Sequence, residues 1–250
     1  ESCLKPIEYY KNNIGILLNM LDCMDKYGVK HIVHSSSCTV YGEPDSLPIK
    51  ETTPTKFAQS PYGNTKQMAE DILHFTTQVK PINAIALRYF NPIGANESAK
   101  IGELPNGVPN NLMPFITQTA IGKRKELTVF GNDYPTPDGT CIRDYIHVMD
   151  LAEAHVVSLD RMFEGKNRQA LEHFNIGTGN GFSVLDVIKS FERTTGEKLP
   201  YVIGPRREGD VIQIWADTTL AKEELGWVAK RTLDQMTYSA WLWEKELAKQ

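Results

Sequence analysis

Two hydrophobic periodicities alternate over residues 1–90, and this alternation restricts the fold more than any other feature of the sequence. Apolar residues recur at helical spacing over residues 7–27, and a run typical of a buried strand follows over residues 29–37. Pro61, in the first-turn position that proline favours, opens a second helical segment that extends to residue 79. Residues 83–89 form another buried-strand pattern. Helix, strand, helix and strand in this order predict an α/β fold, in which crossover helices join parallel strands.

The second half of the chain has a more mixed pattern. We predict short strands at residues 127–130 and 174–176, and helices at residues 183–195, 218–225 and 233–247. Residues 92–109 are rich in glycine and proline and form a loop that is long for a compact domain. Loops of this length are often functional.

Charge, hydropathy and cysteine spacing exclude several classes of protein. The net charge of −4 comes without a basic stripe, which argues against a nucleic-acid partner. No apolar stretch is long enough to span a membrane. The four cysteines are scattered, which indicates reduced thiols and a cytoplasmic location rather than a zinc site or a disulfide framework. His31 and His34 fall on opposite faces of a predicted strand, so we expect no metal site there.

Tyr62 and Lys66 carry the strongest local signal for chemistry. They are four residues apart at the start of a predicted helix and therefore share one face. A nearby ammonium lowers the pKa of a phenol, and moving it from about 10 to near 7 takes about 4 kcal/mol. The pair is thus suited to remove a hydroxyl proton. Taken alone, so short a pattern also fits a surface tyrosine and a solvated lysine, although none of the other tyrosines has lysine four residues later.

Ligands of open α/β sheets bind beyond the carboxyl ends of the strands, and the serines at residues 35–37 and the segment 89–91 lie at such ends. Ser37, Tyr62 and Lys66 together resemble the Ser-Tyr-Lys set of the extended short-chain dehydrogenases/reductases. Longer motifs are similar to those of UDP-galactose 4-epimerases, from Glu1 to about Trp243. They are SSSCTVYG (35–42), LRYFNPIGA (87–95), PNNLMP (109–114), FGNDY (130–134), DGT (138–140), RDYIHV (143–148) and RREGD (206–210).

The resemblance implies a mechanism and a cofactor. Tyr62 would take the proton of the sugar 4-hydroxyl, Lys66 would lower the pKa of Tyr62 and hold the nicotinamide ribose, and Ser37 would bond the same hydroxyl and relay the proton. The C4 hydride would pass to NAD, and the 4-keto sugar would turn over and take it back on its other face. Asn12 and Phe90 match family positions that contact the cofactor.

The resemblance also implies a substrate-binding set for UDP-galactose and UDP-glucose. Arg143 and Arg207 would clamp the diphosphate, since arginine forks suit phosphate. Asp210 would accept from the uridine ribose. The remaining members of the set are Asn91 and Asn111 at the phosphate–sugar region, Tyr89 as a wall of the sugar site, and Thr39, Leu112, Phe130 and Ile214. Alternatives stay open: surface ion pairs for the arginines, a turn or cap for Asn111, and a plain core aromatic for Tyr89.

The sequence departs from the family at its start. Nothing there resembles the strand and glycine-rich turn that hold the pyrophosphate in this family, and the glycines at 177, 179 and 181 have the wrong spacing. We therefore predict an incomplete Rossmann-like parallel sheet, lacking about three βα units of roughly 30 residues each. Residues 1–92 would be the remainder of the NAD domain. Residues 93–250 would be mainly a smaller α/β UDP-sugar domain, with residues 143–180 returning to the first. We expect the chain alone to be unstable or inactive.

Three questions of function remain open in the sequence. Ile214 stands where the family varies between tyrosine and cysteine, so the use of UDP-N-acetylhexosamines is undecided. A sister dehydratase or decarboxylase is an alternative, but Cys38 and Thr39 stand where dehydratases carry carboxylates. A non-catalytic nucleotide-binding protein is another, although such proteins usually lose the tyrosine or the lysine. A homodimer through the helices at 7–27 and 62–79 follows from the resemblance.

Overall fold

The computed structural model describes residues 1–207 and 209–249, and it divides into two compact units. Unit 1 comprises residues 1–90, 153–176 and 217–228, and unit 2 comprises residues 91–152, 177–216 and 229–250. The sequence predicts a division at residue 92, with residues 143–180 returning to the first domain. In the structure the division falls after Phe90, and residues 153–176 belong to unit 1. Residues 217–228 also belong to unit 1, which the sequence does not predict.

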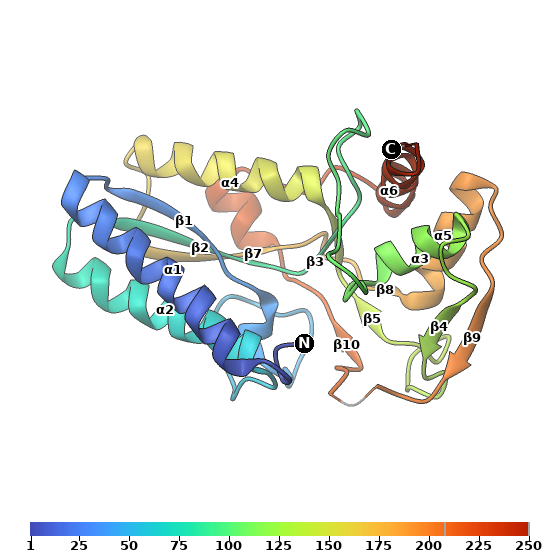
Figure 1. The fold of residues 1–250 in the computed structure, drawn as a ribbon. Coiled ribbons are helices and arrows are strands. Elements are labelled where there is room, and N and C mark those ends of the chain that lie inside the picture. Colours follow the sequence, from blue (N-terminus) through green and yellow to red (C-terminus); the bar gives the residue numbers. More distant parts are fainter. Residues whose placement is uncertain (208, 250) are drawn as a thin grey trace. The chain divides into compact units, whose positions relative to one another are not determined.

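Unit 1 is built on a three-stranded parallel sheet with helices on both faces (Figure 1). The sheet order is β1-β2-β7, with β2 in the centre and with Val33 opposite Ile85 and Leu87 opposite Phe174. The elements of the unit are α1 (Pro6–Tyr27), β1 (His31–Ser35), the 3₁₀ turn η1 (Cys38–Tyr41), α2 (Pro61–Val79), β2 (Asn83–Tyr89), the larger part of α4 (Val148–Phe163), β7 (Leu171–Ile176) and the π-turn η2 (Ala221–Leu225). The predicted parallel α/β fold is confirmed.

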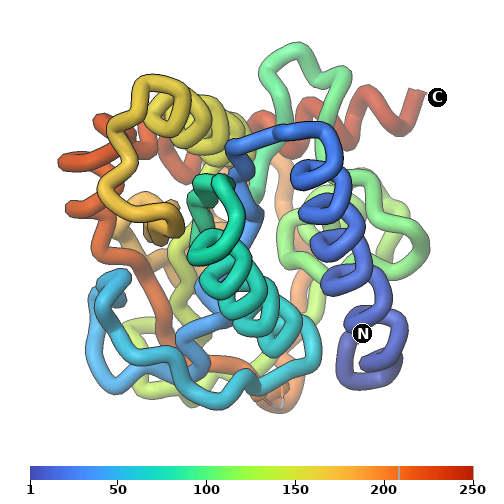
Figure 2. The backbone as a smooth tube through the Cα atoms, turned by 90° about the vertical axis from the view of Figure 1, so that its left-hand side faces the viewer, coloured from blue at the N-terminus to red at the C-terminus, as the bar shows by residue number. Residues whose placement is uncertain are grey.

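Helices α1 and α2 lie side by side on one face of this sheet (Figure 2). Their apolar faces and the alanines of β2 form a buried cluster, in which Leu17, Leu21 and Leu73 take part. Local signals set the helix ends: Ser60 accepts a hydrogen bond from the Gly63 N–H at 3.1 Å, and Gly28 ends α1 with φ of 70°. The Ser60 cap and Pro61 fix where α2 begins, and the predicted segment 61–79 matches the observed helix.

The first strand is shorter than predicted. Residues 29–37 were expected to be extended, but β1 covers His31–Ser35 only. The chain then turns, because Ser37 caps η1 by accepting from the Thr39 N–H at 3.2 Å. This turn places three consecutive serines at the carboxyl end of β1.

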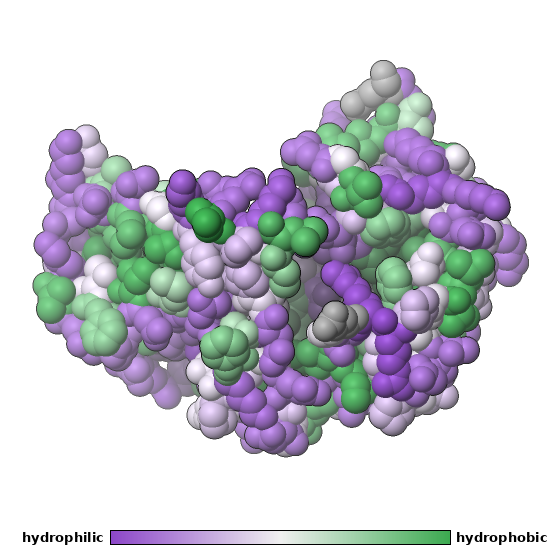
Figure 3. All heavy atoms as spheres, turned by 60° about the horizontal axis from the view of Figure 1, so that its bottom comes forward, coloured by the Kyte–Doolittle hydropathy of each residue, from purple (hydrophilic) through white to green (hydrophobic). Residues whose placement is uncertain are grey.

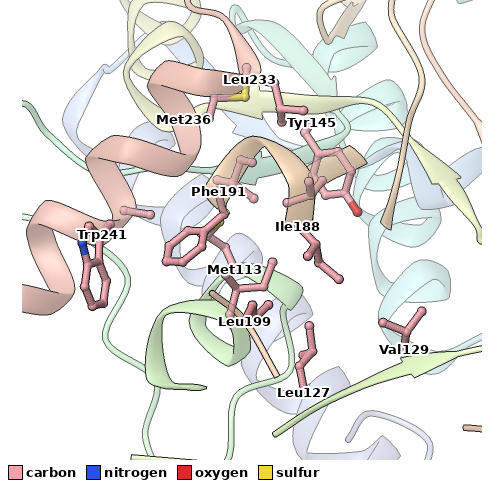
Figure 4. Close-up of a cluster of buried hydrophobic side chains, with 14 residues drawn as sticks. Met113, Leu127, Val129, Tyr145, Ile188, Phe191, Leu199, Leu233, Met236 and Trp241 are labelled. Atoms are coloured by element: carbon pink, nitrogen blue, oxygen red, sulfur yellow. The ribbon is translucent and has the colours of Figure 1, made fainter. Parts of the chain in front are cut away.

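Unit 2 consists of short strand pairs and three helices around one apolar core. The pairs are β3 (Asn91–Ile93) with β6 (Tyr145–His147) and β4 (Leu127–Phe130) with β9 (Tyr201–Gly204), and β5 (Ile142–Arg143) lies between β10 (Gln213–Ile214) and β8 (Phe182–Ser183). The helices are α3 (Leu112–Ala120), α5 (Val184–Thr195) and α6 (Leu233–Leu247). Figure 4 shows how side chains from these helices and from β4 meet in the core.

Truncation of Phe191 is expected to destabilise unit 2 strongly. Its ring is fully buried in the core and meets Trp241 edge to face with ring centroids 5.7 Å apart. Phe191→Ala should cost about 3–5 kcal/mol, because the transfer free energy is lost and a cavity remains. The free energy of unfolding in urea measures this effect. Phe57→Ala, at a side chain that is 89% exposed, is the control, and an equal loss in both variants would contradict the assignment.

Among the described residues, no helix is both long enough and apolar enough to cross a membrane.

Candidate functional site

The candidate catalytic group of unit 1 lies where β1 ends and α2 begins. Tyr62 is in the first turn of α2 and Lys66 one turn later, facing the serines that follow β1. The Lys66 ammonium lies 5.5 Å from the centre of the Tyr62 ring and donates to the Ser35 carbonyl at 2.8 Å. The Ser37 side chain is near the Tyr62 phenol and lowers its pKa. The fold therefore brings together the three residues that the sequence singled out.

The electrostatics of Tyr62 differ from the sequence-based prediction. Burial raises the pKa of Tyr62 well above its ordinary value and nearby Tyr89 adds to the rise, while the Ser37 side chain lowers it. Burial also lowers the pKa of Lys66. The sequence predicts that Lys66 lowers the pKa of the phenol. In the structure the ammonium is directed to a backbone carbonyl, and the loss of hydration of the phenolate dominates.

Thr39 has a property that points to a ligand. Its hydroxyl is buried and makes no hydrogen bond to any residue that the structure describes. Thr39 lies in η1, two residues after Ser37, and its side chain is close to Gly63 of α2. A buried hydroxyl without a partner is costly unless a ligand or water satisfies it. Tyr89, also assigned to the substrate, lies in the same unit; burial raises the pKa of its phenol and Ser35 lowers it.

Asn13 belongs to this group but was missed by the sequence analysis. Its amide donates to the Thr65 hydroxyl at 2.8 Å, and Thr65 donates to the Tyr62 carbonyl at 2.7 Å. Asn13 lies on the same face of α1 as Leu17, and an isolated polar residue on an apolar helix face was the signal that could have revealed it. Two further residues were predicted to contact the cofactor. Asn12 is exposed on α1, and Phe90 is buried.

Asn13, Thr65 and Lys66 also border a cavity of about 250 Å³ in unit 1. His34 lines it, and its Nε2 atom is buried without a partner among the described residues. Burial lowers the pKa of His34 to about 4, and the charge of Lys66 adds to this effect. The imidazole is therefore neutral at pH 7.

Protonation of His34 should make the free energy of unfolding depend on pH in the acidic range. Its pKa is lower in the folded protein than in the unfolded chain, so the unfolded chain binds more protons between pH 6.5 and pH 4. Stability is complete above pH 6.5 and falls as the pH drops toward 4, by at most about 3 kcal/mol. His34→Phe should reduce this loss, as measured by urea unfolding at pH 7 and pH 4. Identical slopes in both proteins would show that His34 protonates freely in the folded state.

Unit 2 contains a second candidate site, a cavity of about 400 Å³. Several elements contribute to it: β5, the N-terminus of α3, the end of β4 and the loop after β9. The predicted substrate residues Asn91, Asn111, Leu112, Phe130, Arg143, Arg207 and Asp210 all line it. Ile214 does not; it is buried in β10 and pairs in register with Arg143. Glu208 of the motif at 206–210 lies outside the described residues.

The cavity of unit 2 is suited to an anion. Arg143 and Arg207 line it, as does Arg124, which the sequence analysis missed although it stands in a short basic run. The Arg143 guanidinium donates to the Ile142 carbonyl at 2.9 Å and lies 3.7 Å from the carboxylate of Asp210. Part of its charge therefore remains available to a ligand in the cavity.

Asn111 holds the N-cap position of α3, but its side chain makes no capping bond. Its amide instead donates to the carboxylate of Glu103 at 2.7 Å. The alternative interpretation of Asn111 as a cap residue is therefore correct for the backbone only, and the side chain stays at the border of the cavity.

The sequence and the structure are both similar to those of known proteins. The family model described as GDP-mannose 4,6 dehydratase matches residues 1–239. A UDP-glucose 4-epimerase from Bacillus subtilis is 50% identical over 98% of this chain and 71% of its own length. The structure is similar to that of a Stenotrophomonas maltophila UDP-glucose-4-epimerase with bound NAD and formylated UDP-arabinopyranose (TM-score 0.95, 45% identity, 100% and 73% of the two chains). It is also similar to a Bifidobacterium longum UDP-glucose 4-epimerase in complex with NAD+ and UDP (TM-score 0.92, 47% identity, 98% and 72% of the two chains).

Proposed function

This chain belongs to the UDP-glucose 4-epimerase family of extended short-chain dehydrogenases/reductases, and we propose that it inverts C4 of UDP-galactose and UDP-glucose with Tyr62 as the base. The observation that carries the proposal is the arrangement of Ser37, Tyr62 and Lys66 at one strand end. The phenol takes the proton of the 4-hydroxyl, and the Ser37 hydroxyl orients it. The unpartnered hydroxyl of Thr39 supplies a further contact for the hexose.

The donor set of unit 1 fits NAD, which when bound would supply a reversible hydride acceptor for C4 of the sugar. The Lys66 ammonium is half-buried and points toward the strand end, where it is suited to hold ribose hydroxyls. Asn12 and Phe90 are the further residues that we assign to the cofactor. A cationic ring beside Tyr62 would favour the phenolate, against the rise in pKa that burial causes.

We assign the cavity of unit 2 to the uridine diphosphate. Arg143 and Arg207 would pair with the diphosphate, and Asp210 would accept a hydrogen bond from the uridine ribose. Asn91 and Asn111 would bond the phosphate–sugar region, with Leu112 and Phe130 as apolar contacts. Tyr89 would wall the sugar in unit 1.

A sister dehydratase is the second candidate because the matching family model carries that description. Elimination of water needs a second acid or base next to the reacting carbon. Cys38 and Thr39, which directly follow Ser37, have no carboxylate, and the Cys38 side chain is buried. This favours epimerisation over dehydration.

The protein expressed from its complete gene should convert UDP-galactose to UDP-glucose without net formation of NADH. Product chromatography and the absorbance of bound NAD measure this result. A 4-keto-6-deoxy product would instead support the dehydratase, and bound NAD without turnover would support a non-catalytic nucleotide-binding protein. A second incubation with UDP-N-acetylgalactosamine tests the effect of Ile214, which is intermediate in size between the residues that the family uses.

We also propose a homodimer that pairs α1 and α2. Exposed apolar side chains lie on both helices, among them Ile16, Met20 and Phe75. Figure 3 shows hydrophobic residues scattered between polar ones over one face of the molecule. Sedimentation at the mass of a single chain would contradict the proposal.

The free cysteines support the expected cytoplasmic location.

A further inference from the structure

A buried ion pair lies behind the strand end that carries Ser37. The guanidinium of Arg88 (β2) donates to both carboxylate oxygens of Glu70 (α2), at 2.6 Å and 3.0 Å. The side chains are 7% and 9% exposed, so both charges are removed from water. Glu70 follows Lys66 by one helical turn and Tyr62 by two, and so it shares their face of α2.

Each partner of this pair also contacts one end of the turn that contains Ser37. The Ser36 hydroxyl is fully buried and donates to Glu70 at 2.6 Å. At the other end of the turn, the Tyr41 hydroxyl accepts from Arg88 at 3.0 Å. The Tyr41 ring also lies 4.9 Å below the guanidinium. Residues 36–41 are thus held at their first and last positions by one ion pair.

The outer side of this network is fixed as well. The Tyr41 hydroxyl donates to the Asn175 side chain at 2.7 Å, and the Asn175 amide donates to the Ile49 carbonyl at 2.9 Å. The Glu51 carboxylate accepts from the Asn175 N–H at 2.7 Å. The turn is therefore connected to α2, β2, β7 and the loop before α2.

A buried ion pair is seldom the most stable pair of side chains for a buried position. Well-packed apolar residues are often as stable or more so, because desolvation offsets the attraction between the charges. What the pair supplies is direction: one hydrogen bond to Ser36 and one to Tyr41, the side chains that flank Ser37 and Thr39. Two further hydrogen bonds, between Arg88 and Glu70, fix the pair itself. Catalysis is sensitive to this, since a shift of 1 Å at a reacting group can cost about 100-fold in rate.

We propose that Glu70 and Arg88 are positioning residues, which act through Ser36 and Tyr41 to hold the Ser37 hydroxyl against Tyr62. The inference rests on the proposed function for its kinetic consequence only. The geometry of the turn can be tested without turnover.

Ser36→Ala and Tyr41→Phe test the proposal, because each releases one end of the turn and leaves the ion pair intact. Each variant should lower kcat roughly 10-fold with KM for UDP-galactose unchanged. Amide hydrogen exchange of the peptide over residues 36–41 should be at least about 10-fold faster than in the wild type, with exchange of α6 unchanged. The exchange result is expected whether or not the wild type turns over UDP-galactose.

Ser158→Ala is the matched control. This serine is fully buried in the same unit and donates to the Ala154 carbonyl at 2.7 Å, far along the chain from the strand end. It should lose stability like Ser36→Ala but keep kcat and the exchange of residues 36–41. Unchanged exchange of that peptide in both test variants would overturn the proposal, as would a loss of kcat that only follows the folded fraction. Absence of turnover in the wild type would instead refute the proposed function.

Discussion

Replacement of Tyr62 by phenylalanine is expected to lower kcat for UDP-galactose epimerisation by about 10³-fold, the middle of the range for loss of a general base. The substitution removes only the hydroxyl, and the ring remains packed against Tyr9, whose ring centre is 6.4 Å away. KM for UDP-galactose should change little, since the phenol contributes to the transition state more than to binding. Steady-state kinetics with both UDP-hexoses measure the effect.

Tyr9→Phe is the control for this experiment. Tyr9 lies beside Tyr62, but its hydroxyl is bonded to Glu1 at 3.2 Å on the exposed side of α1. Loss of that hydroxyl should leave kcat within about twofold of the wild type, since surface substitutions away from a site have small effects. A Tyr62→Phe variant as active as Tyr9→Phe would mean that another group removes the proton.

Replacement of Arg143 by methionine should weaken the binding of UDP by roughly 10–100-fold, the value of a charge-assisted hydrogen bond of about 1.5–3 kcal/mol. Two effects add. The diphosphate loses a guanidinium that is mostly buried, and the carboxylate of Asp210, 3.7 Å from that guanidinium, is left uncompensated inside the cavity. Calorimetric titration with UDP gives the dissociation constant directly.

Arg206→Met provides the comparison for Arg143. Arg206 is 45% exposed and pairs with Asp133 at 2.7 Å in the same unit, and it does not line the cavity. Its removal tests whether net charge alone determines the affinity. If UDP binding is weakened equally in both variants, the effect comes from the overall charge of unit 2. The assignment of Arg143 to the diphosphate would then be wrong.

Local signals explain which elements the sequence predicted correctly. The predicted segments 61–79, 83–89 and 233–247 match α2, β2 and α6 as observed. The N-terminal ends of the two helices are fixed by neighbours in the chain, the Ser60 and Thr232 caps. Helix α4 was not predicted because its start lacks an ordinary capping signal. It follows β6 directly, and the Met149 N–H bonds the imidazole of His147 in place of an ordinary capping residue.

Residue spacing alone established the parallel α/β order, the Tyr62–Lys66 pair on one helix face and the strand end that faces it, because these follow from chain connectivity and helix period. Tertiary packing decided the rest. It buried Tyr62 so that its pKa rises, directed Lys66 to a backbone carbonyl and placed Asn13 beside Thr65. It also gathered Asn91, Arg143 and Arg207 into one cavity. Burial and convergence depend on residues far apart in the chain, so no local pattern contains them.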